Sequence, residues 1–121
     1  VLTALRSLSK LLLVQCLPEK GPIPRQLAQL DNLDTLALCR NKLTGTLPNT
    51  LWKLTKLEIL DLSGNKLQGR ISSDVGKLTR LRCFRIQQNL LVGALPVEAL
   101  AAIKTLKKTR LDTKITMQFW K

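Results

Sequence analysis

The chain has 121 residues, which is enough for one domain with one hydrophobic core. It carries 20 Lys and Arg against 8 Asp and Glu, and this formal net charge of +12 favours acidic partners, polyanions or anionic surfaces. His is absent, and the three cysteines (Cys16, Cys39 and Cys83) form no CxxC pair, so the spacing of a zinc finger is excluded.

The sequence repeats itself with a period of 24 residues. The repeat is visible at three sets of equivalent positions: Leu33, Leu57 and Leu81; Asn41, Asn65 and Asn89; Gly45, Gly69 and Gly93. Repeats occupy about 33–56, 57–80 and 81–105, an imperfect one precedes them at about 8–32, and a degenerate repeat or cap follows at 106–121. Such a period predicts a solenoid in which each unit buries its core against its neighbours. We expect a single domain over residues 1–121.

Each unit is expected to begin with a short β-strand whose alternate side chains point into the core. The strands should pair in parallel, centred near Leu12, Ala37, Asp61, Arg85 and Arg110. The chain then turns at Asn41, Asn65 and Asn89, a structural ladder of amides that bond main-chain groups in the turn. Cys16 takes this place in the first unit as a weaker substitute.

The second half of each unit is expected to bend and return on the opposite side. Its glycine suits a bend that needs positive φ or close approach of the backbone. The proline that follows fixes an extended segment. Leucines three residues apart, such as Leu51, Leu54 and Leu57, predict a short 3₁₀ turn, in which residues i and i+3 share a face.

The string Leu43-Thr44-Gly45-Thr46-Leu47-Pro48 resembles the LxGxIP signature of the plant-type leucine-rich repeat, as do residues 91–96 and Gly21-Pro22-Ile23-Pro24. Similar repeats build the ectodomains of plant receptor-like kinases and the polygalacturonase inhibitors of plant cell walls. The resemblance covers about residues 8–105. It implies a leucine-rich repeat solenoid: a right-handed α/β-type horseshoe segment with a short parallel sheet on the concave face and 3₁₀ or irregular turns on the convex face.

The resemblance also implies an extracellular or cell-surface location, but the sequence departs from the family in several respects. Ser72 stands where proline is expected. Paired-cysteine caps, an Asn-x-Ser/Thr sequon and a signal peptide are all missing, so an intracellular location stays open. No apolar run approaches the ~20 residues of a membrane-spanning helix.

The expected concave face supplies the candidate partner-binding residues. They occupy the third, fifth, seventh and eighth places of the units: Thr35, Ala37, Cys39, Arg40, Ile59, Asp61, Ser63, Cys83, Arg85, Gln87, Gln88, Lys108 and Arg110. This surface is apolar at its N-terminal end and basic toward the C-terminus. Solenoids commonly bind partners through this face, so we expect a protein or peptide ligand. The alternative is a solvated sheet that binds nothing.

The sequence is poor in catalytic groups. Without His, and with its acids scattered, the chain offers no acid–base pair, metal cluster or activated nucleophile. We therefore expect a monomeric, non-catalytic recognition module that needs no cofactor and belongs to a receptor or signalling protein. Two alternatives remain: a binder of polyanions (acidic polysaccharide or nucleic acid) driven by the +12 charge, and a structural fragment of a longer receptor-like kinase.

Two further expectations concern the ends of the solenoid. A disulfide between Cys16 and Cys39 is disfavoured because Cys16 should turn inward and Cys39 outward. At the other end, Leu106–Phe119 is expected to form the last strand and its return, with Phe119 or Trp120 folded over the leucines of the fourth unit. The alternative for this segment is a frayed basic tail.

Overall fold

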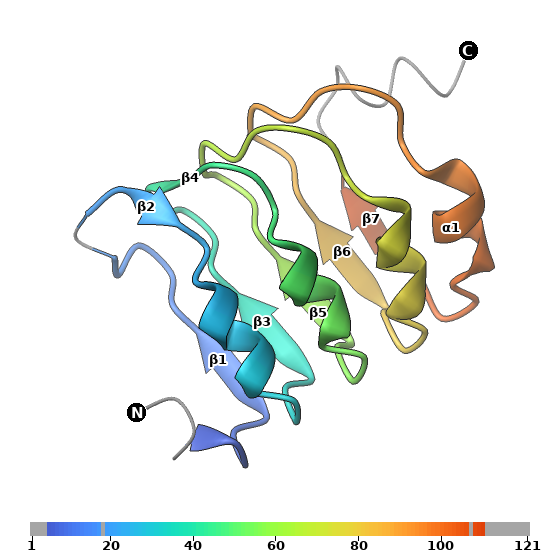
Figure 1. Ribbon diagram of the computed structural model, residues 1–121, viewed down its shortest axis with the longest axis horizontal. Coiled ribbons are helices and arrows are strands. Elements are labelled where there is room, and N and C mark those ends of the chain that lie inside the picture. Colours follow the sequence, from blue (N-terminus) through green and yellow to red (C-terminus); the bar gives the residue numbers. More distant parts are fainter. Residues whose placement is uncertain (1–4, 18, 107, 111–121) are drawn as a thin grey trace.

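The computed structural model describes residues 5–17, 19–106 and 108–110. Five short strands form one parallel sheet in the order β1-β3-β5-β6-β7 (Figure 1). Their bounds are β1 Lys10–Leu12, β3 Thr35–Ala37, β5 Ile59–Asp61, β6 Cys83–Arg85 and β7 Lys108–Arg110. The register follows the repeat, since Leu36 pairs with Leu60 and Leu60 with Phe84. The five parallel strands are confirmed, and each is centred one residue earlier than expected.

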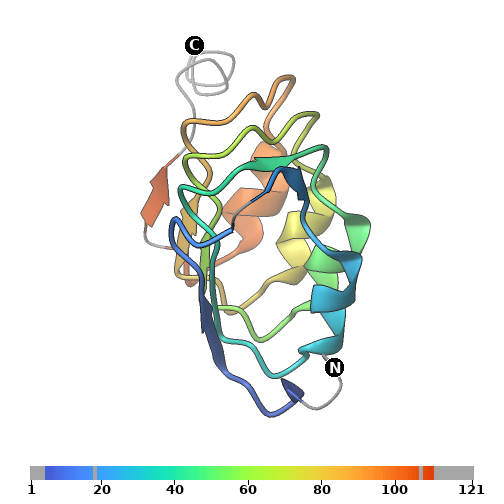
Figure 2. The ribbon, with the colours of Figure 1, turned by 90° about the vertical axis from the view of Figure 1, so that its left-hand side faces the viewer.

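Short helical segments return the chain on the opposite side of the sheet, as Figure 2 shows in a view along the stack. Three of them are 3₁₀ helices: η2 Arg25–Gln29, η3 Asn49–Lys53 and η4 Ser73–Lys77. The fourth, α1 Val97–Ala102, is a turn and a half of α-helix. Its sequence contains three alanines and a leucine, the residues of highest helix propensity, which explains the departure from a 3₁₀ turn.

The core lies between the sheet and these helical segments and consists mainly of leucine. Leu36, Leu60 and Phe84, the central residues of three neighbouring strands, are completely buried. Trp52 of η3 is also buried and fills the convex side of the same core. Each unit's leucines therefore cover those of the next unit, which is how a 24-residue segment too small to fold alone becomes stable.

A second parallel ladder runs along the edge where the main strands end, and the sequence did not predict it. It starts with β2 Gly21–Pro22 and β4 Leu43–Thr44, which pair in parallel, and continues through a bridge between Thr46 and Gln68. Hydrogen bonds extend it to the fourth unit, where Leu90 N–H donates to Leu67 O at 2.8 Å and Val92 N–H to Gly69 O at 2.9 Å.

The asparagine side chains bridge successive units at the turn. Asn65 Nδ2 donates to the carbonyls of Leu38, Leu62 and Ser63 at 3.0–3.2 Å. Its Oδ1 accepts the main-chain N–H groups of Asn41 and Leu43 at 3.1 and 3.2 Å. Asn41 and Asn89 repeat this pattern one unit earlier and one unit later.

Two places of the unit require a left-handed backbone. The expected one is the glycine of the second bend, where φ is positive at Gly45, Gly69 and Gly93. The other, which was not expected, is the eighth place, at Gln15, Arg40, Gly64 and Gln88. Ser72 keeps the extended geometry of Pro24 and Pro48 in the two preceding units, with φ −69° and ψ 147°, and its hydroxyl accepts the N–H of Asp74 at 3.0 Å. The missing proline therefore leaves the bend unchanged.

The first unit corrects one expectation. Cys16 was expected to turn inward but is exposed, and its Sγ donates to Val14 O at 3.1 Å. The reason is that no unit in the described part of the chain covers this end, so Leu11 and Leu13 are also only half-buried. All three cysteines are free thiols. At the other end, β7 lies inside the expected last strand, whereas residues 111–121, including Phe119 and Trp120, fall outside the described residues.

Candidate functional site

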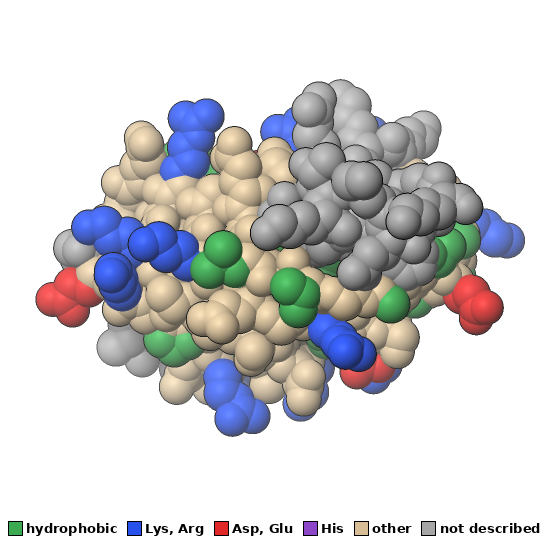
Figure 3. Space-filling model, turned by 90° about the horizontal axis from the view of Figure 1, so that it is seen from above, with side chains coloured by type: hydrophobic (Ala, Val, Ile, Leu, Met, Phe, Trp, Pro, Cys, Tyr) green, Lys and Arg blue, Asp and Glu red, His purple; other side chains and the backbone are tan. Residues whose placement is uncertain are grey.

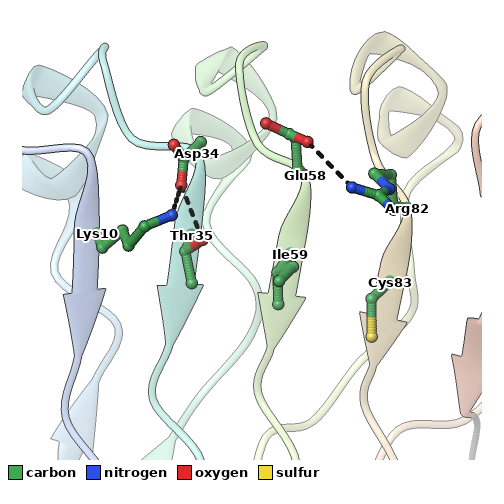
Figure 4. Close-up of a pocket in the computed structure, with 7 residues that line it drawn as sticks. All are labelled: Lys10, Asp34, Thr35, Glu58, Ile59, Arg82 and Cys83. Carbon is green, nitrogen blue, oxygen red and sulfur yellow. Dashed lines mark hydrogen bonds and ion pairs between the residues drawn. The ribbon is translucent and has the colours of Figure 1, made fainter.

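A groove of about 360 Å³ opens on the concave sheet near the starts of the strands (Figure 4). It is built from the second and third places of successive units, so equivalent positions of the repeat lie side by side. Its lining residues are Lys10, Asp34, Thr35, Glu58, Ile59, Arg82 and Cys83.

Main-chain hydrogen bonds hold these positions in place. The carbonyl of Asp34 accepts the N–H groups of both Glu58 and Ile59, at 2.7 and 3.0 Å. One unit later, the carbonyl of Glu58 accepts those of Arg82 and Cys83 at the same distances. The groove is therefore a rigid part of the sheet, and its shape depends on which side chains the repeat places there.

Two ion pairs flank an apolar side chain in the groove. Lys10 Nζ lies 3.0 Å from Asp34 Oδ1, and Arg82 lies 3.7 Å from Glu58 Oε1 (Figure 4). Hydrogen bonds from Lys10 and then from the Thr35 hydroxyl hold the pKa of Asp34 below its ordinary value, so this carboxylate is ionised at neutral pH. Ile59 lies between the pairs with 39% of its surface exposed. The groove thus combines an apolar floor with charged rims.

The groove contains three of the predicted residues, Thr35, Ile59 and Cys83, but it also corrects the prediction. Thr35 and Ala37 were expected to face solvent, and both are buried. They are small, and longer side chains flank them in the register: Lys10 and Ile59 beside Thr35, Leu12 and Asp61 beside Ala37.

The other four lining residues lie outside the predicted set: Lys10, at the third place of the first unit, and Asp34, Glu58 and Arg82. The last three occupy the second place of the unit, before the strand starts. The available signal was that this place is charged in three consecutive units and changes sign between Glu58 and Arg82.

The other predicted residues lie beyond the groove along the same face. Asp61 is engaged by Ser63, whose hydroxyl and N–H both donate to Oδ1, at 2.6 and 3.1 Å. Burial and the neighbouring Asp61 raise the pKa of the Cys39 thiol, which therefore stays protonated and weakly nucleophilic at neutral pH. The remaining positions are as follows: Arg40 and Gln88 are exposed in turns, Arg85 and Gln87 are half-buried on β6 and just after it, and Lys108 and Arg110 belong to β7.

Comparison with known proteins identifies the repeat. A leucine-rich repeat family model matches residues 23–67. The chain also superimposes on PEPR1 in the structure of its complex with AtPEP1, with a TM-score of 0.83 and 32% identity over 91% of this chain. The chain is built of plant-type leucine-rich repeats.

Two further solved structures are similar to this chain. One is the ectodomain of the plant membrane receptor kinase GASSHO1/SCHENGEN3 from Arabidopsis thaliana in complex with CASPARIAN STRIP INTEGRITY FACTOR 2, at TM-score 0.74 and 36% identity over 77% of this chain. The other is the plant peptide hormone receptor RGFR1 in complex with RGF2, at TM-score 0.81 and 25% identity over 91% of this chain. The comparison with curated protein sequences finds no match.

The leucine-rich repeat chain is much shorter than these receptors. It spans 15% of the PEPR1 chain, 11% of the GASSHO1 chain and 17% of the RGFR1 chain. Within residues 5–17, 19–106 and 108–110, no helix has the length and apolar character needed to cross a membrane. The same residues contain no cluster of three His, Cys, Asp or Glu side chains that could hold a metal ion.

Proposed function

We propose that this leucine-rich repeat protein is a non-catalytic recognition module that binds a protein or peptide partner through its concave face, as part of a cell-surface receptor. The observation that carries the proposal is the groove with Ile59 between the Lys10–Asp34 and Glu58–Arg82 pairs. Similarity to receptor ectodomains solved with their ligands supports both the partner class and the location.

The groove suits a segment of polypeptide that offers both polar and apolar groups. An aliphatic side chain of the partner would cover Ile59, and main-chain or charged groups would contact the ion pairs at the rims. Leu12 and Val14, exposed by 60% and 43%, extend the apolar surface toward the N-terminal end. Apolar contacts surrounded by polar ones are the usual composition of a binding interface.

A displayed library of random peptides tests this function. Peptides selected on the wild-type chain should bind the Ile59→Glu variant about ten-fold more weakly, because a carboxylate in the apolar floor must be desolvated. The matched control is Val97→Glu, which alters an apolar side chain of α1 that is 43% exposed on the convex side.

Thermal melts establish that both variants are folded before binding is compared. Selected peptides that bind equally well to Ile59→Glu, Leu12→Glu and Arg82→Glu variants would show that the concave face is not the binding surface. The polyanion alternative has less support at this site, because the cations of the groove, Lys10 and Arg82, are each paired with a carboxylate.

A further inference from the structure

Paired and unpaired charges lie at different edges of the molecule. The four ion pairs of the described residues lie either near the strand starts (Arg6–Asp31, Lys10–Asp34, Glu58–Arg82) or within η4 (Asp74–Lys77). The opposite edge, where the main strands end, carries exposed basic residues that join none of these pairs. We call this set the basic strip: Lys20, Arg40, Lys42, Lys66 and Arg70.

The second ladder holds the basic strip in place. Lys20 and Lys42 directly precede β2 and β4, which pair with each other, and Lys66 N–H donates to Leu43 O at 2.8 Å. The Arg70 side chain packs against Gly93 of the next unit. A Cβ added to Gly93 would lie within 3.0 Å of three Arg70 side-chain atoms. The cations are therefore held on neighbouring strands of one ladder, across the first three units.

Figure 3 looks down on this edge and shows Lys and Arg side chains at several points across it, with Asp and Glu only toward the periphery. Glu19, beside Lys20, is the acidic residue nearest to the strip in sequence. Such an excess of one sign attracts an oppositely charged partner and orients it during approach.

An apolar pair continues the basic strip into the fourth unit. Leu90 and Val92 are each 57% exposed, more than any other large apolar side chain of the described residues except Leu12. Their N–H groups bond to the carbonyls of Leu67 and Gly69, so Val92 lies next to Arg70 on the ladder. One continuous surface therefore presents five cations and then two aliphatic side chains.

We propose that the basic strip, together with Leu90 and Val92, binds an acidic segment of a partner protein on a face separate from the concave groove. A polypeptide can supply both carboxylates for the cations and an aliphatic side chain for the apolar pair. Single-stranded nucleic acids stack on exposed aromatic side chains, but within residues 5–17, 19–106 and 108–110 both aromatic side chains, Trp52 and Phe84, are buried.

A membrane fits this surface less well than a protein does. Membrane-surface anchors bury an apolar face several ångströms deep among the lipid headgroups. Leu90 and Val92 instead belong to a ladder whose main chain is bonded to the preceding unit, so they continue the same row of strands that carries the basic side chains. A row of this kind suits an extended chain laid across it.

Peptide binding measured by fluorescence anisotropy tests the proposal. The probe is a glutamate-rich peptide of roughly twelve residues with two leucines, long enough when extended to cross all the units. Its counterpart has glutamine in place of every glutamate. Wild-type protein at physiological salt should bind the glutamate peptide at least about ten-fold more tightly than the glutamine peptide.

Variants locate the binding surface. The double substitution Lys42→Glu and Lys66→Glu should weaken binding about ten-fold, and Leu90→Ser with Val92→Ser several-fold. The control is Lys53→Glu with Lys104→Glu, which makes the same charge change at two exposed lysines away from the strip. It should change binding less than about two-fold. Ile59→Glu should have no effect, so failure here is distinguishable from failure of the concave-face function.

Three outcomes would overturn the proposal. The first is no binding of the glutamate peptide by the wild-type protein. The second is an equal loss of peptide affinity in the strip variant (Lys42→Glu with Lys66→Glu) and in the control variant (Lys53→Glu with Lys104→Glu), which would show that binding depends only on net charge. The third is tighter, strip-dependent binding of oligothymidine or of phosphatidylserine vesicles than of the peptide, which would assign the strip to nucleic acid or to membranes.

Discussion

The side chain of each ladder asparagine forms hydrogen bonds with main-chain groups that would have no partner in a sharp turn. Asn65 is the clearest case because it is buried and makes five hydrogen bonds to main-chain groups of two units. Buried main-chain groups without partners are costly, so the side chain stabilises the turn and the interface between units together.

Substitution of Asn65 by leucine, which is similar in size but cannot hydrogen-bond, should therefore destabilise the fold by about 1–3 kcal/mol. Urea unfolding followed by circular dichroism would measure the change. Asn49→Leu is a suitable control, since Asn49 is exposed at the start of η3. Equal stability of the two variants would contradict the role assigned to the ladder.

The eighth place of the unit requires a residue with a positive φ. Gly64 has φ +69°, and a Cβ there would lie 3.2 Å from Arg40 Cγ and 3.3 Å from Arg40 N. Gln15, Arg40 and Gln88 adopt the same left-handed region with ordinary side chains. These residues tolerate a conformation that costs an L-residue about 1–2 kcal/mol.

Gly64→Ala should consequently lower the free energy of unfolding by about 1–2 kcal/mol, from the unfavourable φ and the close approach to Arg40. Gly21→Ala is the matched comparison, because a Cβ at Gly21 meets no atom within 4 Å and its φ lies outside the left-handed region. That variant should be neutral or slightly more stable. A thermal melt in which Gly21→Ala loses as much as Gly64→Ala would refute this explanation.

At the scale of elements, the sequence predicted the strands, bends and turns whose residues recur at the same place in each unit. The parallel strands, the bend at the glycines and the 3₁₀ helices follow from positions that recur every 24 residues. The second ladder was missed because it depends on main-chain hydrogen bonds and has no distinctive side-chain pattern. The burial of Thr35 and Ala37 depends on the lengths of side chains in neighbouring strands, which no single unit reveals. The groove was predicted only in part for the same reason. The exposure of Ile59 follows from its place in the repeat, but the ion pairs form between adjacent units and could not be read from one unit alone.

The Lys10–Asp34 pair, which joins the first two strands, should make stability depend on acid pH. The pKa of Asp34 is lowered in the folded state, so its contribution is present above the ordinary aspartate pKa and is lost as pH falls through the folded value. Asp34→Asn should therefore melt below the wild type at pH 7, and the difference should vanish in acid. Melts between pH 7 and pH 2 would measure it. A difference that is constant over this range would exclude the linkage.

At the scale of the whole molecule, stability is distributed unevenly along the stack. Leu60, in the middle strand, is completely buried, whereas Leu11 occupies the equivalent place in β1 and is only half-buried. Native-state hydrogen exchange should accordingly be faster in the first unit than in β5, because local opening begins where the fewest apolar contacts must be broken.

Alanine substitutions at these two leucines should show the same gradient. Leu60→Ala should cost about 2–5 kcal/mol, since it leaves a cavity between two covering units. Leu11→Ala should cost about 1–2 kcal/mol, because the site is partly solvated already. Chemical denaturation of the two variants would compare them. Equal costs would show that the first unit is packed as tightly as the centre.

The strict 24-residue register between β3, β5 and β6 gives the gene an unusual freedom. A recombination event that joins any position of one unit to its equivalent in the next adds or removes one whole period. The junction still pairs strand with strand and asparagine with turn, because these contacts join equivalent places of neighbouring units. The length of the chain can therefore change by one repeat at a time while the remaining units keep their geometry. New combinations of outward-facing side chains can arise in this way without disrupting the packing between units.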